Sequence, residues 1–155
     1  MSINSSDLSV IANTNLVSLR QVLLDLFVKL AYQEGDFLLS SGQKSSYYIN
    51  GKQVTLRGDG ALAIGRLIFA MLPENTQAVA GLTLGADPIV TAVSVVSAYE
   101  NNPLPALIVR KEAKGHGTMA YIEGPSLPNG ANVVVLEDVV TTGKSAMLAV
   151  ERLRD

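Results

Sequence analysis

Residues 132–145, N-V-V-V-L-E-D-V-V-T-T-G-K-S, constrain the fold more than any other stretch of this chain. The run from Val133 to Leu136 is apolar and β-branched, which is typical of a central parallel strand covered on both faces. Two adjacent acids, a turn of small residues and the start of a helix follow directly. Because ligands of open parallel sheets bind beyond the carboxyl ends of the strands, this turn is expected at a ligand-binding edge.

The turn Thr141–Gly143 is suited to a single phosphate, because backbone N–H groups and the helix dipole converge where a helix begins. A polyphosphate loop of the form G-x-x-x-x-G-K-[ST] is excluded, since Asp138 stands where its first glycine is needed. Glu137 and Asp138 beside this cradle suit a ligand with one phosphate and vicinal hydroxyls, such as a ribose 5-phosphate, with or without a divalent cation. The alternative is an acidic helix cap, but partly desolvated carboxylates without a partner are costly, which favours a ligand.

The composition limits the class of protein. With 155 residues the chain is long enough for one domain with a sizeable core, and 48% hydrophobic residues exclude a disordered chain. A net charge of −2 gives no reason to expect a nucleic-acid-binding face. The absence of cysteine, of a basic and apolar leader, and of an apolar run of about 20 residues predicts a cytoplasmic protein without a membrane span.

Helical and strand patterns alternate along the chain, which predicts an α/β fold: an open, mainly parallel sheet flanked by helices. Residues 1–13 are rich in Ser and Asn and are expected to fray. Asn15 can cap the first helix, which Gly35 would end. The expected helices are this one, 59–71, 88–99 and one that follows Gly143, and the expected strands are 37–39, 46–49, 78–82, 105–109 and 133–136.

Three cations and the only histidine lie within the segment Arg110–Gly117, directly after a predicted strand. A solvated charged loop is the simpler interpretation. However, the chain has only 12 Lys and Arg residues, and the strand places these at the ligand edge. Glycines at 115 and 117 would let the loop close over a substrate with an anionic leaving group such as pyrophosphate.

Each of two further segments allows two interpretations. The segment 81–88, G-L-T-L-G-A-D-P, is either a strained strand-to-helix turn or a second anion cradle at a helix start. Tyr47 and Tyr48 either pack in the core or form a wall for an aromatic base. Core packing is expected for at least one of them, because neighbours on a strand point to opposite faces.

Together these segments resemble the type I phosphoribosyltransferases, and specifically the orotate phosphoribosyltransferase family. Residues 133–143 resemble the phosphoribosyl-diphosphate signature of the whole superfamily, whereas 110–117 resembles the more specific catalytic loop of the orotate enzymes. Segment 81–88 and the pattern of Ser41-Gly42, Ser45 and Tyr47-Tyr48 are also similar. The similarity runs from about Glu34 to the end of the chain.

The resemblance implies transfer of a phosphoribosyl group from phosphoribosyl diphosphate to orotate, giving orotidine 5′-phosphate and pyrophosphate in pyrimidine biosynthesis. It implies Mg²⁺, held mainly through the substrate near the acid pair, and a homodimer that shares the 110–118 loop. Lys114 and Asp138 are implied as catalytic, and Tyr48 and Thr141 as orotate-binding. The residues implied to bind phosphoribosyl diphosphate are Arg110, Lys111, Lys114, His116, Glu137, Asp138, Val139, Val140, Thr141, Thr142, Gly143, Lys144 and Ser145.

The resemblance also implies the domain organisation: one domain over 1–155, with a small hood of helix and strands and base-site elements at 15–51, and a core at 58–155. Some family members carry a lysine where Ser40 and Gly85 stand, so those diphosphate contacts do not carry over. The family has a further strand with an arginine for the orotate carboxylate, and the core is expected to lack it before Asp155. A purine phosphoribosyltransferase and a non-catalytic nucleotide-binding homologue are the alternatives.

Overall fold

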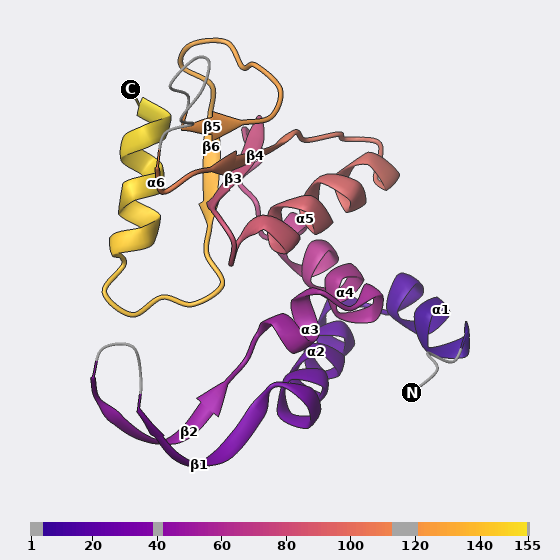
Figure 1. The fold of residues 1–155 in the computed structure, drawn as a ribbon. Coiled ribbons are helices and arrows are strands. Elements are labelled where there is room, and N and C mark those ends of the chain that lie inside the picture. The colour runs from indigo at the N-terminus through magenta and orange to yellow at the C-terminus, as the bar shows by residue number, and fades with distance from the viewer. Residues whose placement is uncertain (1–4, 39–41, 113–120, 155) are drawn as a thin grey trace. The chain divides into compact units, whose positions relative to one another are not determined.

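The computed structural model of the protein describes residues 5–38, 42–112 and 121–154 (Figure 1). The chain divides into two compact units, residues 1–63 and 64–155. The elements of the first are α1 (Ser5–Asn13), α2 (Leu16–Leu30), β1 (Tyr32–Leu38), β2 (Lys44–Ile49), α3 (Lys52–Thr55) and the start of α4 (Gly58–Phe69). Those of the second are the rest of α4, β3 (Ala78–Leu82), α5 (Asp87–Tyr99), β4 (Ala106–Val109), β5 (Ile122–Glu123), β6 (Val133–Leu136) and α6 (Lys144–Arg154).

The first unit is built on a capped helix and a two-stranded hairpin. The Asn15 side chain accepts a hydrogen bond from the Ser18 amide at 3.0 Å, so this residue caps α2 as predicted. The prediction that Gly35 ends this helix is wrong: α2 ends at Leu30, and Gly35 lies within β1. Helix α1 occupies much of the segment for which the composition predicts fraying.

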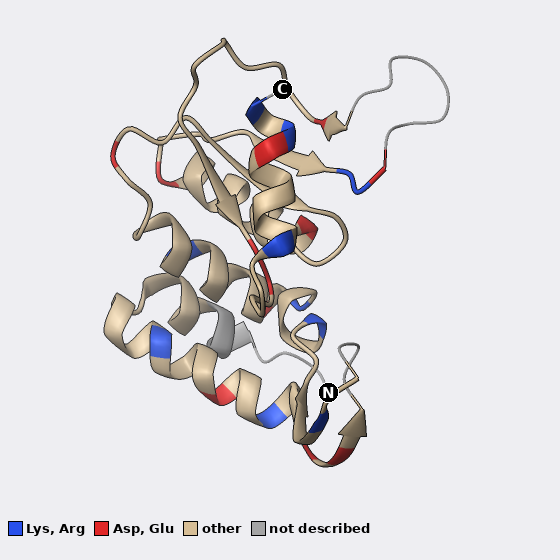
Figure 2. Ribbon diagram, turned by 90° about the vertical axis from the view of Figure 1, so that its left-hand side faces the viewer, with Lys and Arg blue, Asp and Glu red and all other residues tan. Residues whose placement is uncertain are grey.

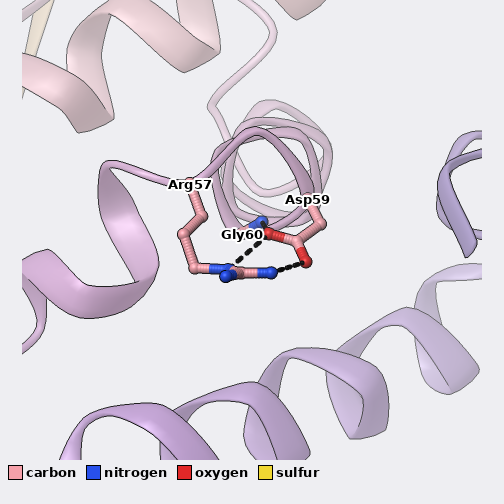
Figure 3. A network of polar contacts seen from close by, with 3 residues as sticks. All are labelled: Arg57, Asp59 and Gly60. Atoms are coloured by element: carbon pink, nitrogen blue, oxygen red, sulfur yellow. Dashed lines mark hydrogen bonds and ion pairs between the residues drawn. The ribbon is translucent and has the colours of Figure 1, made fainter. Parts of the chain in front are cut away.

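An ion pair closes the turn that leads into α4 (Figure 3). The Arg57 guanidinium donates two hydrogen bonds to the Asp59 carboxylate, at 3.0 and 2.8 Å, and the Gly60 amide donates a third at 2.8 Å. The hydrogen bond from Arg57 is the main cause that lowers the pKa of Asp59. The buried Asp59 carboxylate is therefore charged, and its hydrogen bonds stabilise the start of α4.

The second unit is a four-stranded sheet in the order β5-β4-β3-β6, in which β3 is parallel to both β4 and β6. Only β5 is antiparallel to its neighbour, β4. Side chains of β3 alternate between two apolar clusters: Val79 packs with Val90 and Val93 of α5, whereas Ala80 and Leu82 pack with Ala149 of α6. Helices thus cover both faces of the sheet, which confirms the predicted α/β fold (Figure 1).

The prediction that 133–136 is a central strand is wrong for the described residues. Strand β6 pairs only with β3 and lies at the edge of the sheet, and all four of its residues are half-buried. The fully buried strand is β3. An apolar β-branched run shows that both faces of a strand are covered, but it carries no information about the strand's lateral neighbours.

Candidate active site

Three segments meet where the parallel strands end. The register pairs Gly81 with Leu136, and the Thr83 amide donates a hydrogen bond to the Val109 carbonyl at 2.9 Å. The segments 83–87, 110–111 and 137–143 therefore leave the same edge of the sheet. In Figure 2 the ribbon is blue at Lys and Arg and red at Asp and Glu, which marks the charged residues along these segments and α6. This is the edge at which open parallel sheets bind ligands.

The acid pair directly follows β6, and Glu137 and Asp138 are both half-buried. The Asp138 amide donates to one Glu137 carboxylate oxygen at 3.2 Å. The other, Oε2, is buried and has no hydrogen-bond partner among the described residues. Burial, followed by hydrogen bonding to Asp138 and repulsion from its charge, raises the pKa of Glu137, while the nearby charge of Lys111 opposes this. A buried acceptor of this kind calls for a donor or a cation.

Gly85 leaves the space that the Asp138 carboxylate occupies. A Cβ at position 85 would lie 2.5 Å from Cγ and 2.6 Å from Oδ2 of Asp138, well inside ordinary contact. Segment 81–88 and the acid pair are therefore in direct contact, although Gly85 and Asp138 are 53 positions apart in the sequence (138 − 85 = 53). A lysine at this position would not fit the observed arrangement without displacing the carboxylate.

The turn before α5 holds a second carboxylate. The Thr83 hydroxyl donates to Asp87 Oδ2 at 2.9 Å, while Oδ1 of Asp87 is buried and unpartnered within the described chain. Leu84 is exposed, and the peptide bond between Thr83 and Leu84 is cis. The hydrogen bond between Thr83 and Asp87 spans this turn, and the helix that follows, α5, carries Pro88 in its first turn.

The predicted phosphate cradle is an open turn. Val139, Val140, Thr141 and Thr142 are all exposed, and Gly143 has a φ of 74°, a conformation that glycine adopts without strain. Helix α6 begins at Lys144, and its first turn leaves backbone N–H groups without partners inside the helix. Val139 and Val140, the two valines after the acid pair, are thus not packed into the core.

The structure describes the cationic segment Arg110–Gly117 only as far as Glu112. Arg110 makes an ion pair with Glu123 at 3.4 Å, and the exposed Lys111 is close enough to Glu137 to lower its pKa. Lys114 and His116 lie outside the described residues. Strand β5 is not among the strands that the sequence predicts, and its only signal there is the short apolar pair Tyr121-Ile122 before Gly124-Pro125.

The two tyrosines of the first unit are on β2. Tyr48 is 43% exposed with its ring 5.6 Å from that of Phe37, and Tyr47 is 50% exposed and stacked 6.0 Å from Tyr32. The prediction that one of them is buried in the core is therefore wrong, because each packs on a single neighbouring ring of a two-stranded hairpin. Tyr48 and Thr141 belong to different compact units.

The described residues contain no group of three or more His, Cys, Asp or Glu placed to hold a metal ion. In this part of the chain, the carboxylates at the sheet edge are those of Asp87 and of the acid pair, and two of their oxygens, Oδ1 of Asp87 and Oε2 of Glu137, are buried without a hydrogen-bond partner. Among the described helices, none combines the length and the apolarity needed to cross a bilayer.

The known proteins reported below that are similar to this chain are all orotate phosphoribosyltransferases. No family model matches the chain. It is 76% identical over 143 residues to the orotate phosphoribosyltransferase of Nostoc sp., which covers 92% of this chain and 69% of that relative. Among solved structures, it is similar to Mycobacterium tuberculosis orotate phosphoribosyltransferase in complex with Fe(III) dicitrate, with a TM-score of 0.76, 38% identity and coverage of 88% and 77%. The same enzyme in complex with 5-phospho-α-D-ribosyl 1-diphosphate gives a TM-score of 0.70 and 35% identity, and the match covers 88% of this chain and 75% of that one. The chain therefore belongs to the orotate phosphoribosyltransferase family.

Proposed function

We propose that the edge formed by Gly85, Glu137 and Asp138 and the turn before α6 is where this family member binds phosphoribosyl diphosphate. The family transfers the 5-phosphoribosyl group from this substrate to orotate, giving orotidine 5′-phosphate and pyrophosphate in pyrimidine biosynthesis. The observation that carries the proposal is the half-buried acid pair, one of whose oxygens has no partner in the described chain, next to an exposed turn at a helix start.

In this proposal each segment binds a different part of the substrate. The backbone of 139–145 binds the 5′-phosphate, because a helix start offers N–H donors to an anion. The acid pair accepts hydrogen bonds from the ribose hydroxyls, which satisfies the orphaned Oε2 of Glu137. The cations Arg110, Lys111, Lys114 and His116 contact the diphosphate.

Mg²⁺ fits this site. It prefers oxygen ligands and binds through one or two carboxylates together with substrate phosphates, and Glu137 offers a buried, unpartnered carboxylate oxygen. The acid pair would therefore hold the ion, mainly with the substrate. When bound, the ion neutralises charge on the diphosphate.

The residues of the chain favour departure of the diphosphate. Breakage of the bond between C1 and the diphosphate leaves a ribose with oxocarbenium character and an anionic leaving group. Lys114 and its neighbouring cations stabilise the departing charge, and Asp138 holds the ribose hydroxyls in register for attack by the base. No covalent nucleophile takes part.

The orotate half of the site is proposed to involve Tyr48 and Thr141. We also propose a cytoplasmic homodimer in which the 110–118 loop of one subunit serves the neighbouring site. Sedimentation of the purified protein tests the dimer, and mixing of a loop variant with an acid-pair variant tests whether the loop is shared. Recovery of activity in the mixture is expected only if two subunits build one site.

Turnover with different bases tests the reaction. Purified protein with phosphoribosyl diphosphate and Mg²⁺ should consume orotate, seen as a fall in orotate absorbance, and should leave adenine and hypoxanthine unchanged. Consumption of a purine instead would favour the purine enzyme. Binding of phosphoribosyl diphosphate without turnover of any base would favour a non-catalytic homologue and contradict the proposal.

A further inference from the structure

A cation lies directly over an aromatic ring in the second unit. The guanidinium carbon of Arg152, on α6, is 3.5 Å from the centroid of the Tyr121 ring. A cation within about 6 Å of a ring face is attracted by the ring quadrupole, and more strongly when it is partly removed from water. Arg152 is half-buried, and its Nε is buried without a hydrogen-bond partner among the described residues. The ring of Tyr121 therefore covers a guanidinium whose Nε has no described hydrogen-bond partner.

Tyr121 is coupled through its backbone to Arg110. The Arg110 amide donates a hydrogen bond to the Tyr121 carbonyl at 2.7 Å, and the neighbouring residues Val109 and Ile122 are paired in the antiparallel register. The ion pair between Arg110 and Glu123 lies beside them. A displacement of Tyr121 is therefore passed to Arg110 and to Lys111, which follows it.

The pairing needs an anchor, because β5 has only two residues and is antiparallel at the edge of the sheet. Such short edge pairing opens readily unless side chains hold it. Helix α6 packs on the core of the sheet through Ala149, so Arg152 reaches Tyr121 from a fixed element. Figure 1 shows the C-terminal half of α6 beside β5.

We propose that Arg152 is a positioning residue: by stacking on Tyr121 it holds the backbone pairing between Tyr121 and Arg110, and thereby places Arg110 and Lys111 for the diphosphate. The second half of this inference depends on the proposed function of those two cations. The first half concerns only the fold of the second unit. Its test therefore needs one readout that is independent of the substrate.

Hydrogen exchange of the Arg110 amide, followed by NMR, is that readout. Arg152→Ala should speed this exchange by about 3- to 30-fold, the range expected when a partly buried cation–π contact is lost. Arg152→Lys should recover part of the protection, because an ammonium also binds a ring face but does not stack as a plane. Arg154→Ala, an exposed position on the same helix, is the matched control and should leave the rate unchanged.

Substitutions of the Tyr121 ring distinguish a local loss of pairing from a general loss of stability. Tyr121→Phe keeps the ring and should keep slow exchange, whereas Tyr121→Leu should behave as Arg152→Ala does. The Ala80 amide in the buried strand β3 reports global unfolding and should not change. Equal acceleration at Ala80 and Arg110, or no acceleration at Arg110 in either Arg152→Ala or Tyr121→Leu, would overturn the inference.

Calorimetric titration with pyrophosphate tests the link to the diphosphate. Arg152→Ala should weaken pyrophosphate binding by about 3- to 30-fold and raise KM for phosphoribosyl diphosphate by a similar factor, with KM for orotate unchanged. Faster exchange at Arg110 with unaltered pyrophosphate affinity would contradict the role proposed for Arg110 and Lys111 and would leave their positioning by Arg152 in place.

Discussion

Replacement of Gly85 by alanine should damage the site while it leaves the fold intact. A Cβ at this position would lie 2.5 Å from Cγ of Asp138, about 0.9 Å short of the 3.4 Å at which ordinary contact begins. The backbone of Gly85 is not in the left-handed region, so the alanine itself is tolerated. The strain is instead relieved by the carboxylate, the flexible end of a side chain, which must move by about 1 Å.

A shift of about 1 Å in a group that orients a substrate can cost about 100-fold in rate. We therefore expect kcat/KM for phosphoribosyl diphosphate to fall by about 100-fold in Gly85→Ala. The change in unfolding free energy should stay within about 1 kcal/mol, because the lost chain entropy of glycine offsets part of the strain. Steady-state kinetics and thermal denaturation of the same preparation measure the two quantities.

Two controls isolate the contact with Asp138. Gly58→Ala makes the same chemical change where no atom lies within 4 Å of the new Cβ, and it should leave the kinetics unchanged. In an Asp138→Ala background the clash is absent, so Gly85→Ala should cause no further loss of kcat/KM. A Gly85→Ala enzyme with wild-type kinetics, or a further loss in that background, would refute this reasoning.

Two further predictions concern ionisable groups. Asp59→Ala should lower the unfolding free energy by about 1–3 kcal/mol at neutral pH, since charge-assisted hydrogen bonds to a buried carboxylate are lost. Because the pKa of Asp59 is lowered, this carboxylate stabilises the fold at a pH above 3.8, its ordinary pKa, and the stabilisation is lost as the pH falls through the folded pKa. Thermal melts of wild-type protein and Asp59→Ala at neutral and strongly acidic pH measure this. An equal loss of stability in Asp59→Ala at both pH values would contradict it. The pKa of Glu137 is raised, so the folded chain binds more protons than the unfolded chain above 4.5, and the unfolding free energy should fall as the pH rises through this window. Glu137→Gln should reduce that fall in thermal melts from pH 4 to 8, and parallel curves for the two proteins would show that the group is not perturbed.

The sequence predicts several elements of both units correctly because periodicity and turn chemistry are local. Asn15 announces a helix cap, the apolar run 78–82 a strand, and Pro88 the first turn of a helix, and each is found there. Because β3 is parallel to both β4 and β6, the segments that follow these strands share one edge of the sheet, which is where ligands of such sheets bind.

Lateral and long-range relations could not be predicted in this way. The edge position of β6 depends on its neighbours, which an apolar run does not specify. The contact between Gly85 and Asp138 and the stacking of Arg152 on Tyr121 join segments about 30 to 50 residues apart, and no local pattern marks them. The predicted strand 37–39 starts five residues after β1 does, because a glycine such as Gly35 is typical of a helix end, whereas here Gly35 lies at an irregularity within β1.

Binding of phosphoribosyl diphosphate to Asp138→Asn tests the central assignment most directly. Calorimetric titration should show affinity at least about 10-fold weaker than that of the wild-type chain, since hydrogen bonds from the ribose hydroxyls to a charged acceptor are weakened. Affinity for inorganic phosphate should be unchanged, because the backbone cradle remains. Equal affinity of the two proteins for phosphoribosyl diphosphate would reduce the acid pair to a helix cap and contradict the site described.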